Sequence, residues 1–143
     1  MNTGVKVGDC MNTNLVTISD SAGLTEAAEK MKKGKVGSLI VTDARGSKYG
    51  IITKSDLLFK GFAVNSKLAV KDIISSPLIG IVPDADIAEA AKLMRDSKLK
   101  RLVVTEGQKI IGILAEGDII AVSPALYDLI AEKERFQTET EKN

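Results

Sequence analysis

The chain of 143 residues contains no histidine and no tryptophan, only one cysteine, and just 3% aromatic residues. Without histidine, the Ser-His and Cys-His nucleophiles and most zinc sites are excluded, and a pH switch between about 5 and 8 is disfavoured. Cys10 cannot form an internal disulfide, so a reducing compartment is favoured, and we expect this residue to be a small buried hydrophobic side chain. The core must be built from Val, Ile, Leu, Ala and Met.

The chain also lacks an excess of charge of either sign, because it has 20 basic and 19 acidic side chains and a formal net charge of +1. This balance gives no nucleic-acid footprint. No run approaches the ~18 apolar residues of a membrane span, and the start of the chain has no apolar stretch typical of a signal peptide. We therefore expect a cytoplasmic protein without a membrane contact. No paired carboxylates, P-loop or dinucleotide fingerprint occur, so an enzyme is the least favoured class.

What the sequence does contain is an internal repeat. Residues 7–43 match residues 70–106 at an offset of 63, and residues 50–58 match residues 112–120 at an offset of 62. The period is longer than solenoid or propeller units, which indicates two copies of one small α/β unit. Each copy is too small to be very stable by itself, so we expect the two copies to bury a shared face and to hold ligands where they meet. Function should be sought where the copies differ.

Each copy is expected to read β-α-β-β-α after a short helical turn. The clearest helices carry apolar residues at i, i+3, i+4 and i+7 from Leu24 and from Ile87, and Gly34 is expected to end the first of them as its C′ residue. Asp9 and Asp72 occupy the same place in both copies and are expected to cap turns, and Asp86 is expected to be the N-cap of the second helix. Hairpin turns that carry a glycine are expected at residues 43–47 and 106–108. The expected strands are residues 15–18, 38–42 and 49–52 in copy one, and 78–82, 101–105 and 109–114 in copy two; the closing helices are residues 55–62 and 116–122.

The expected domains are repeat one at residues 1–62, repeat two at residues 63–123, and a C-terminal helix with a frayed tail at residues 124–143. Leu126, Leu129 and Ile130 would form the apolar side of that last helix. The two copies are expected to present further apolar helix surface that favours a homodimer, through Leu57, Leu58, Phe59, Ile119 and Ile120.

The most specific stretch runs from Gly50 to Asp56, where a buried strand enters a helix. A hydroxyl at Thr53 and a carboxylate at Asp56 could face one ligand: the helix N-terminus suits phosphate, and an ionised Asp suits a diol such as ribose. The alternative is a capping box with Thr53 as N-cap and Asp56 at N3. Copy two keeps Asp118 but has Ala115 and Gly117 in place of Thr53 and Ser55, so the fold itself does not demand the hydroxyl.

A second candidate is the basic group Lys98, Lys100 and Arg101 before a core strand of copy two. It is either a solvated strand edge or a clamp for phosphates. The matching Gly37 and Ser38 of copy one are small and would leave room for a base or ribose.

The doubled β-α-β-β-α pattern and the closing motif Gly-hydrophobic-hydrophobic-Thr-x-x-Asp resemble tandem cystathionine β-synthase (CBS) domains, also called a Bateman module. Gly50 to Asp56 fits the motif fully, whereas Gly112 to Asp118 departs from it at Ala115. The resemblance implies two repeats packed as one pseudo-two-fold module that binds AMP, ADP, ATP or S-adenosylmethionine in clefts between them.

By the same resemblance, Asp56 and Asp118 would hold ribose and Thr53 would hold the phosphate end. The remaining implied ligand-binding residues are Leu15, Val16, Thr17, Gly37, Ser38, Lys54, Ser55, Leu78, Ile79, Lys100 and Arg101. Which cleft Lys100 and Arg101 serve stays open.

The leading hypothesis is a nucleotide-sensing regulatory module that acts on a separate effector protein and pairs into a homodimer. A structural or interaction dimer with empty clefts is the alternative, and a nucleic-acid-binding regulator is a weaker one.

Overall fold

The computed structural model describes residues 2–74, 76–128 and 130, and it divides into two compact units. Residues 14–78 form one of them, here called the first-repeat unit. Residues 79–143 and residues 1–13 form the other, the second-repeat unit. The spatial units thus differ from the expected division at residue 62, because the segment before each repeat's first strand packs in the other unit.

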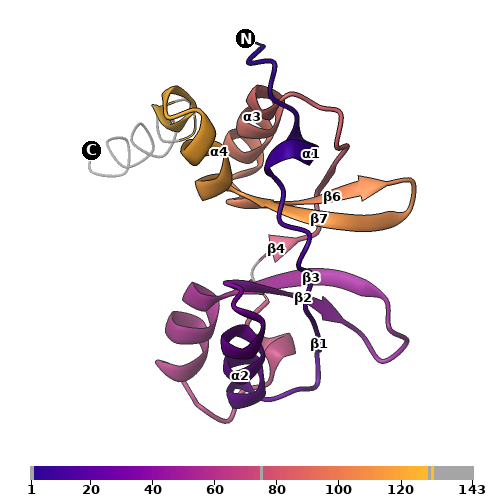
Figure 1. Cartoon of the computed structure of the whole chain (residues 1–143). Coiled ribbons are helices and arrows are strands. Elements are labelled where there is room, and N and C mark those ends of the chain that lie inside the picture. Colours follow the sequence, from indigo (N-terminus) through magenta and orange to yellow (C-terminus); the bar gives the residue numbers. More distant parts are fainter. Residues whose placement is uncertain (1, 75, 129, 131–143) are drawn as a thin grey trace. The chain divides into compact units, whose positions relative to one another are not determined.

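The first-repeat unit is a four-stranded sheet with helices on one face (Figure 1). Strand β1 (Thr17–Ser19) runs parallel to β2 (Ser38–Thr42), which pairs antiparallel with β3 (Lys48–Thr53), and β3 pairs antiparallel with β4 (Ser76–Pro77). The other elements are α2 (Leu24–Gly34), η1 (Asp56–Phe62) and the 3₁₀ turn η2 (Val70–Asp72). The core of this unit joins α2 and η1 to the sheet through Leu24, Met31, Leu39, Ile52, Leu57 and Val70.

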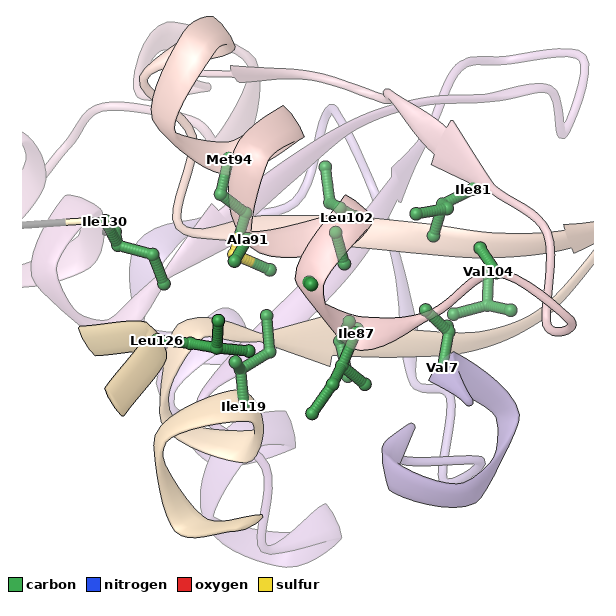
Figure 2. Packing of buried hydrophobic residues seen from close by; sticks show 14 residues of the cluster. Val7, Ile81, Ile87, Ala91, Met94, Leu102, Val104, Ile119, Leu126 and Ile130 are labelled. Carbon is green, nitrogen blue, oxygen red and sulfur yellow. The ribbon is translucent and has the colours of Figure 1, made fainter. Parts of the chain in front are cut away.

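The second-repeat unit repeats this plan with strands β5 (Gly80–Ile81), β6 (Arg101–Glu106) and β7 (Lys109–Ala115). Its helices are α1 (Val7–Cys10), α3 (Ile87–Ser97) and α4 (Glu116–Val122). Figure 2 shows the packing of its core, which includes Val7 from the start of the chain as well as Leu126 and Ile130 beyond α4. Of the expected C-terminal helix, residues 125–128 and 130 are helical, and the remainder, Leu129 included, lies outside the described residues.

Several expectations about local structure are confirmed. Asp9 and Asp72 reach back to the backbone N–H of Lys6 (3.4 Å) and Ala69 (2.9 Å), as turn caps do. Asp86 caps α3 by accepting from Ala88 N at 2.9 Å. The hairpin glycines Gly46 and Gly107 have φ of 80° and 63°, values that other residues rarely adopt.

Three expectations are corrected. Gly34 is the last residue of α2, and the left-handed residue after the helix is Lys35 (φ 54°), with Lys98 (φ 59°) at the same place after α3. Glycine at this position favours close packing, because a Cβ there would lie 3.0 Å from Val16 Cγ2, which is tighter than an ordinary contact. The first strands begin two residues later than expected, and β4 was not anticipated. The closing element of repeat one is a π-helix, a rare form that often marks functional sites.

Candidate functional site

The end of β3 in the first-repeat unit carries a closed group of hydrogen bonds around Asp56. The backbone N–H and the hydroxyl of Thr53 donate to Asp56 Oδ2 at 2.9 and 3.1 Å, and the Asp56 N–H donates to Thr53 Oγ1 at 3.2 Å. This is the capping box that the sequence allowed, and it is formed. Asp56 is buried, being 6% exposed, so the box holds its carboxylate in one place.

The second carboxylate oxygen of Asp56, Oδ1, takes no part in these hydrogen bonds. Its one described ionic neighbour is Lys60, whose Nζ lies 3.5 Å from Oδ1 across one turn of η1. Because more than half of the Lys60 side chain is exposed, this ion pair is screened and contributes ~1 kcal/mol at most. Oδ1 is therefore an anchored acceptor that a ligand hydroxyl could use.

The other candidate residues of repeat one gather at the same end of the sheet. Ser38 lies opposite Thr53 in the β2–β3 register, and Lys54 N donates to Gly37 O at 3.1 Å. On the other side of β2, Ile40 N donates to Val16 O at 2.9 Å, which places the Leu15–Thr17 segment alongside. Lys54 and Ser55 are exposed. The structure thus brings together small residues, an anchored carboxylate and an exposed lysine.

The second-repeat unit holds the corresponding group. Ala115 N donates to Asp118 Oδ2 at 2.8 Å, so the backbone half of the cap is kept without the hydroxyl. Arg101 lies opposite Ala115 in the β6–β7 register, and Glu116 N donates to Lys100 O at 2.9 Å. Ile79 accepts from Val103 N in this unit, whereas Leu78 is the last residue of the first-repeat unit. Lys100 and Arg101 therefore share a unit with Asp118.

One difference between the copies escaped the sequence reasoning. Glu116 stands where copy one has Lys54, so the charge beside the capping aspartate is reversed. Among the described residues, Glu116 Oε2 is the buried side-chain atom without a hydrogen-bond partner. A carboxylate at this place opposes anion binding, whereas Lys54 favours it. Alignment of the two copies at the offset of 62 shows this exchange of charge. The i, i+4 spacing of Asp56 and Lys60 can likewise be read from the sequence.

Cys10 is half-buried rather than fully buried. Burial raises the pKa of its thiol, and the nearby carboxylates Asp9 and Asp118 raise it further. The described residues contain no group of His, Cys, Asp or Glu side chains that could hold a metal ion. Within the same residues, no helix is both long enough and apolar enough to cross a membrane.

The expected homodimer surface is corrected in part. Leu58 and Phe59 are 54% and 67% exposed, but Leu57 and Ile119 are buried in the cores of their own units. Ile120 is half-buried. Phe62 and Val64, which the sequence reasoning did not include, are exposed beside Leu58 and Phe59 in the chain. Four of the exposed large apolar side chains therefore lie on η1 or in the turn after it.

Comparison with known proteins decides the family. The CBS domain model matches the chain twice, at residues 7–61 and 70–125. The chain belongs to the CBS domain family. Both expectations, a tandem CBS pair and its α/β fold, are confirmed.

Relatives of this CBS pair span much of its length. The uncharacterized protein MK0525 of Methanopyrus kandleri is 34% identical over 140 residues, which covers 94% of this chain and 71% of that protein. An uncharacterized conserved protein from Pyrococcus horikoshii has a crystal structure with a TM-score of 0.74 at 26% identity, covering 86% and 95% of the two chains. The crystal structure of CBSX2 in complex with AMP is 29% identical with a TM-score of 0.64, covering 87% and 99%.

Proposed function

We propose that this CBS pair is a regulatory module without catalysis of its own that binds an adenosine-containing ligand, AMP, ADP, ATP or S-adenosylmethionine, and modulates a separate effector protein. The observation that carries the proposal is the buried Asp56 carboxylate, whose Oδ2 is fixed by its cap while Oδ1 has only the screened ion pair with Lys60 among its described contacts. The AMP complex of CBSX2, at 29% identity, supports this ligand class.

In the proposed first site, Asp56 Oδ1 accepts from ribose hydroxyls, and Thr53, Lys54 and Ser55 serve the phosphate end. The base lies against Leu15, Val16, Thr17, Gly37 and Ser38. In the proposed second site, Asp118 holds ribose, with Leu78, Ile79, Lys100 and Arg101 around the ligand. The first site should be the tighter for phosphates, because the second lacks the hydroxyl and carries Glu116 in place of Lys54. Any regulation then requires different ligand affinities in two states of the complex with the effector.

Calorimetry with each of the four ligands tests this proposal, with Asp56→Asn as the decisive variant. Losing a charge-assisted hydrogen bond to ribose should weaken binding by roughly 1–3 kcal/mol, about ten- to a hundredfold. Asp72→Asn is the matched control, because Asp72 caps η2 of the same unit through Ala69 N at 2.9 Å. Equal affinities of the two variants, or no binding of any ligand by the wild type, would favour the alternative, a structural dimer with empty sites. The capping box around Asp56 is compatible with that alternative as well.

We further propose that the chain forms a homodimer through the exposed apolar side chains Leu58, Phe59 and Phe62. All three lie on η1, and several large apolar side chains exposed on one helix favour an interaction surface. Phe59→Asp should convert a dimer into a monomer in analytical ultracentrifugation at micromolar concentration. Val82→Asp is the control, since Val82 is 55% exposed in the other unit. A wild-type monomer, or a Phe59→Asp dimer, contradicts this assignment.

A further inference from the structure

The two repeats end in closing segments that correspond at the offset of 62, residues 54–66 in repeat one and residues 116–128 in repeat two. Of the eight large apolar side chains that are exposed among the described residues, six lie on these segments. Leu58, Phe59, Phe62 and Val64 belong to the first segment, and Val122 and Tyr127 belong to the second. Each unit therefore exposes apolar surface where its repeat ends, which favours an interaction there.

The closing segments differ in the size of their exposed side chains. Phe59 is 67% exposed, and its counterpart at the offset of 62 is Ala121, which is also exposed. One turn before Ala121, a Cβ on Gly117 would meet no atom within 4 Å, so the surface there is open as well. The first segment thus projects a large aromatic ring, and the second offers a low surface on which such a ring could lie.

The closing segments also differ in charge. Residues 54–66 hold two lysines and one aspartate, a net charge of +1. Residues 116–128 hold one glutamate, two aspartates and no basic residue, a net charge of −3. Two segments of the second kind would repel each other, whereas one segment of each kind would attract the other.

The net charges of the whole units have the same signs as those of their closing segments. Residues 14–78 carry ten basic and six acidic side chains, a net charge of +4. Residues 1–13 and 79–143 carry ten basic and thirteen acidic side chains, a net charge of −3. The nearly neutral chain is therefore composed of a positive unit and a negative one. In a dimer, this distribution favours contacts between unlike units.

We infer that, in the homodimer, the closing segment of repeat one in one copy packs against the closing segment of repeat two in the second copy, with Phe59 over Ala121. The inference rests on the homodimer proposed above and adds the surface that the exposed side chains of η1 meet. The partner is a second copy because this chain itself holds the complement of that apolar surface, both in side-chain size and in charge. A dimer with two-fold symmetry makes this contact twice.

The test exchanges the two side chains in the full chain and measures dimer affinity by sedimentation equilibrium. Phe59→Ala should weaken the dimer about tenfold or more, because the contact loses an aromatic side chain. Ala121→Phe should also weaken it, because the added ring meets Phe59 of the partner subunit. The double variant should return to within about threefold of the wild-type affinity, since the large and the small residue are then interchanged. Val82→Phe is the control, because it adds a ring at a 55% exposed site outside both segments and should have no effect.

Salt and charge provide a second test. Because unlike segments meet, the dimer should weaken as the salt concentration rises from about 50 to 500 mM, and Asp128→Lys should weaken it at low salt. The inference is overturned if higher salt strengthens the dimer or if Asp128→Lys fails to weaken it, since like segments would then face each other. It is also overturned if Ala121→Phe acts like Val82→Phe, or if the double variant dimerises no better than Phe59→Ala. A wild-type monomer at micromolar concentration overturns the homodimer itself, whereas the other outcomes overturn only its arrangement.

Discussion

The two units of this CBS pair anchor their first helical turns by equivalent hydrogen bonds. In each unit, that turn comes from the segment that precedes the other repeat. Val7 N donates to Ala85 O at 2.9 Å, and Val70 N donates to Ala22 O at 2.9 Å. These four residues are two identical pairs at the offset of 63. Identity between the copies therefore marks the scaffold, and each turn is anchored in a unit other than the one its sequence repeat predicts.

The copies differ in side chains at the end of their last strand. Asp56 and Asp118 both accept from a backbone N–H three residues earlier, at 2.9 and 2.8 Å, but only Asp56 also has the hydroxyl of Thr53. Beside them stand Lys54 and Glu116, of opposite charge. The comparison separates what the fold requires, an aspartate that reaches back to close a cap, from what a ligand could require, a hydroxyl and a positive charge.

The largest expected effect on stability comes from weakening the packing of the first helical turns, α1 and η2. Each of them packs in the unit of the other repeat. Val7 and Val70 are both 0% exposed, so Val→Ala at either site should cost roughly 1–3 kcal/mol of unfolding free energy. Val7→Ala should lower the hydrogen-exchange protection of β6 and β7 in the second-repeat unit, although Val7 precedes repeat one in the sequence. Val70→Ala should lower the protection of β2 and β3. If each variant instead loosens the repeat that follows it in sequence, the compact units are wrongly assigned.

Periodicity alone was sufficient for the helices. The i, i+3, i+4, i+7 spacing from Leu24 and Ile87 predicted α2 and α3 from their first residues, because an amphipathic stripe has one way to face a sheet. Asp86 as N-cap was equally local. The repeat itself predicted a tandem unit, since two copies of one pattern are expected to fold alike.

What escaped prediction depends on contacts between distant segments. β4 has two residues, Ser76 and Pro77, and forms only because Gly50 and Ile51 lie opposite. Gly34 was expected to be the left-handed residue after the helix, but it is the last residue of α2, and its close approach to Val16 could not be read from the sequence. In the candidate site the cap of Asp56 was predictable from spacing, whereas the burial of Leu57 and Ile119, which removes them from any partner surface, was not.

The difference between the two caps can be tested by exchanging the residue types at positions 53 and 115. Thr53→Ala makes repeat one resemble repeat two and should cost about 1 kcal/mol, because Asp56 loses the hydroxyl hydrogen bond and its own N–H loses an acceptor. Ala115→Thr should stabilise the second-repeat unit by up to a similar amount. Denaturant unfolding monitored with exchange of each unit's amides measures both. Effects of the same sign in the two variants would show that the sites are not equivalent caps.

The smallest expected effect concerns acid and the start of α3. Asp86 accepts from Ala88 N, and this hydrogen bond, with those from the Thr3 hydroxyl, Thr3 N and Gly4 N, lowers its pKa from 3.8 to about 2. Because the folded-state pKa is depressed, the stabilisation is complete above about pH 4 and is lost as the pH falls towards 2.

The N-terminal segment around Thr3 should therefore loosen in that acid window, which its amide exchange rates would report. Gly23, the counterpart of Asp86 in repeat one, has no side chain to titrate, so the start of α2 should not respond through its cap. Asp86→Ser keeps a capping oxygen without a titratable group. Between about pH 4 and 2, the amides of Thr3 and Gly4 should lose exchange protection in the wild type relative to this variant. Identical pH profiles of the two proteins would show that titration of Asp86 does not cause the loosening.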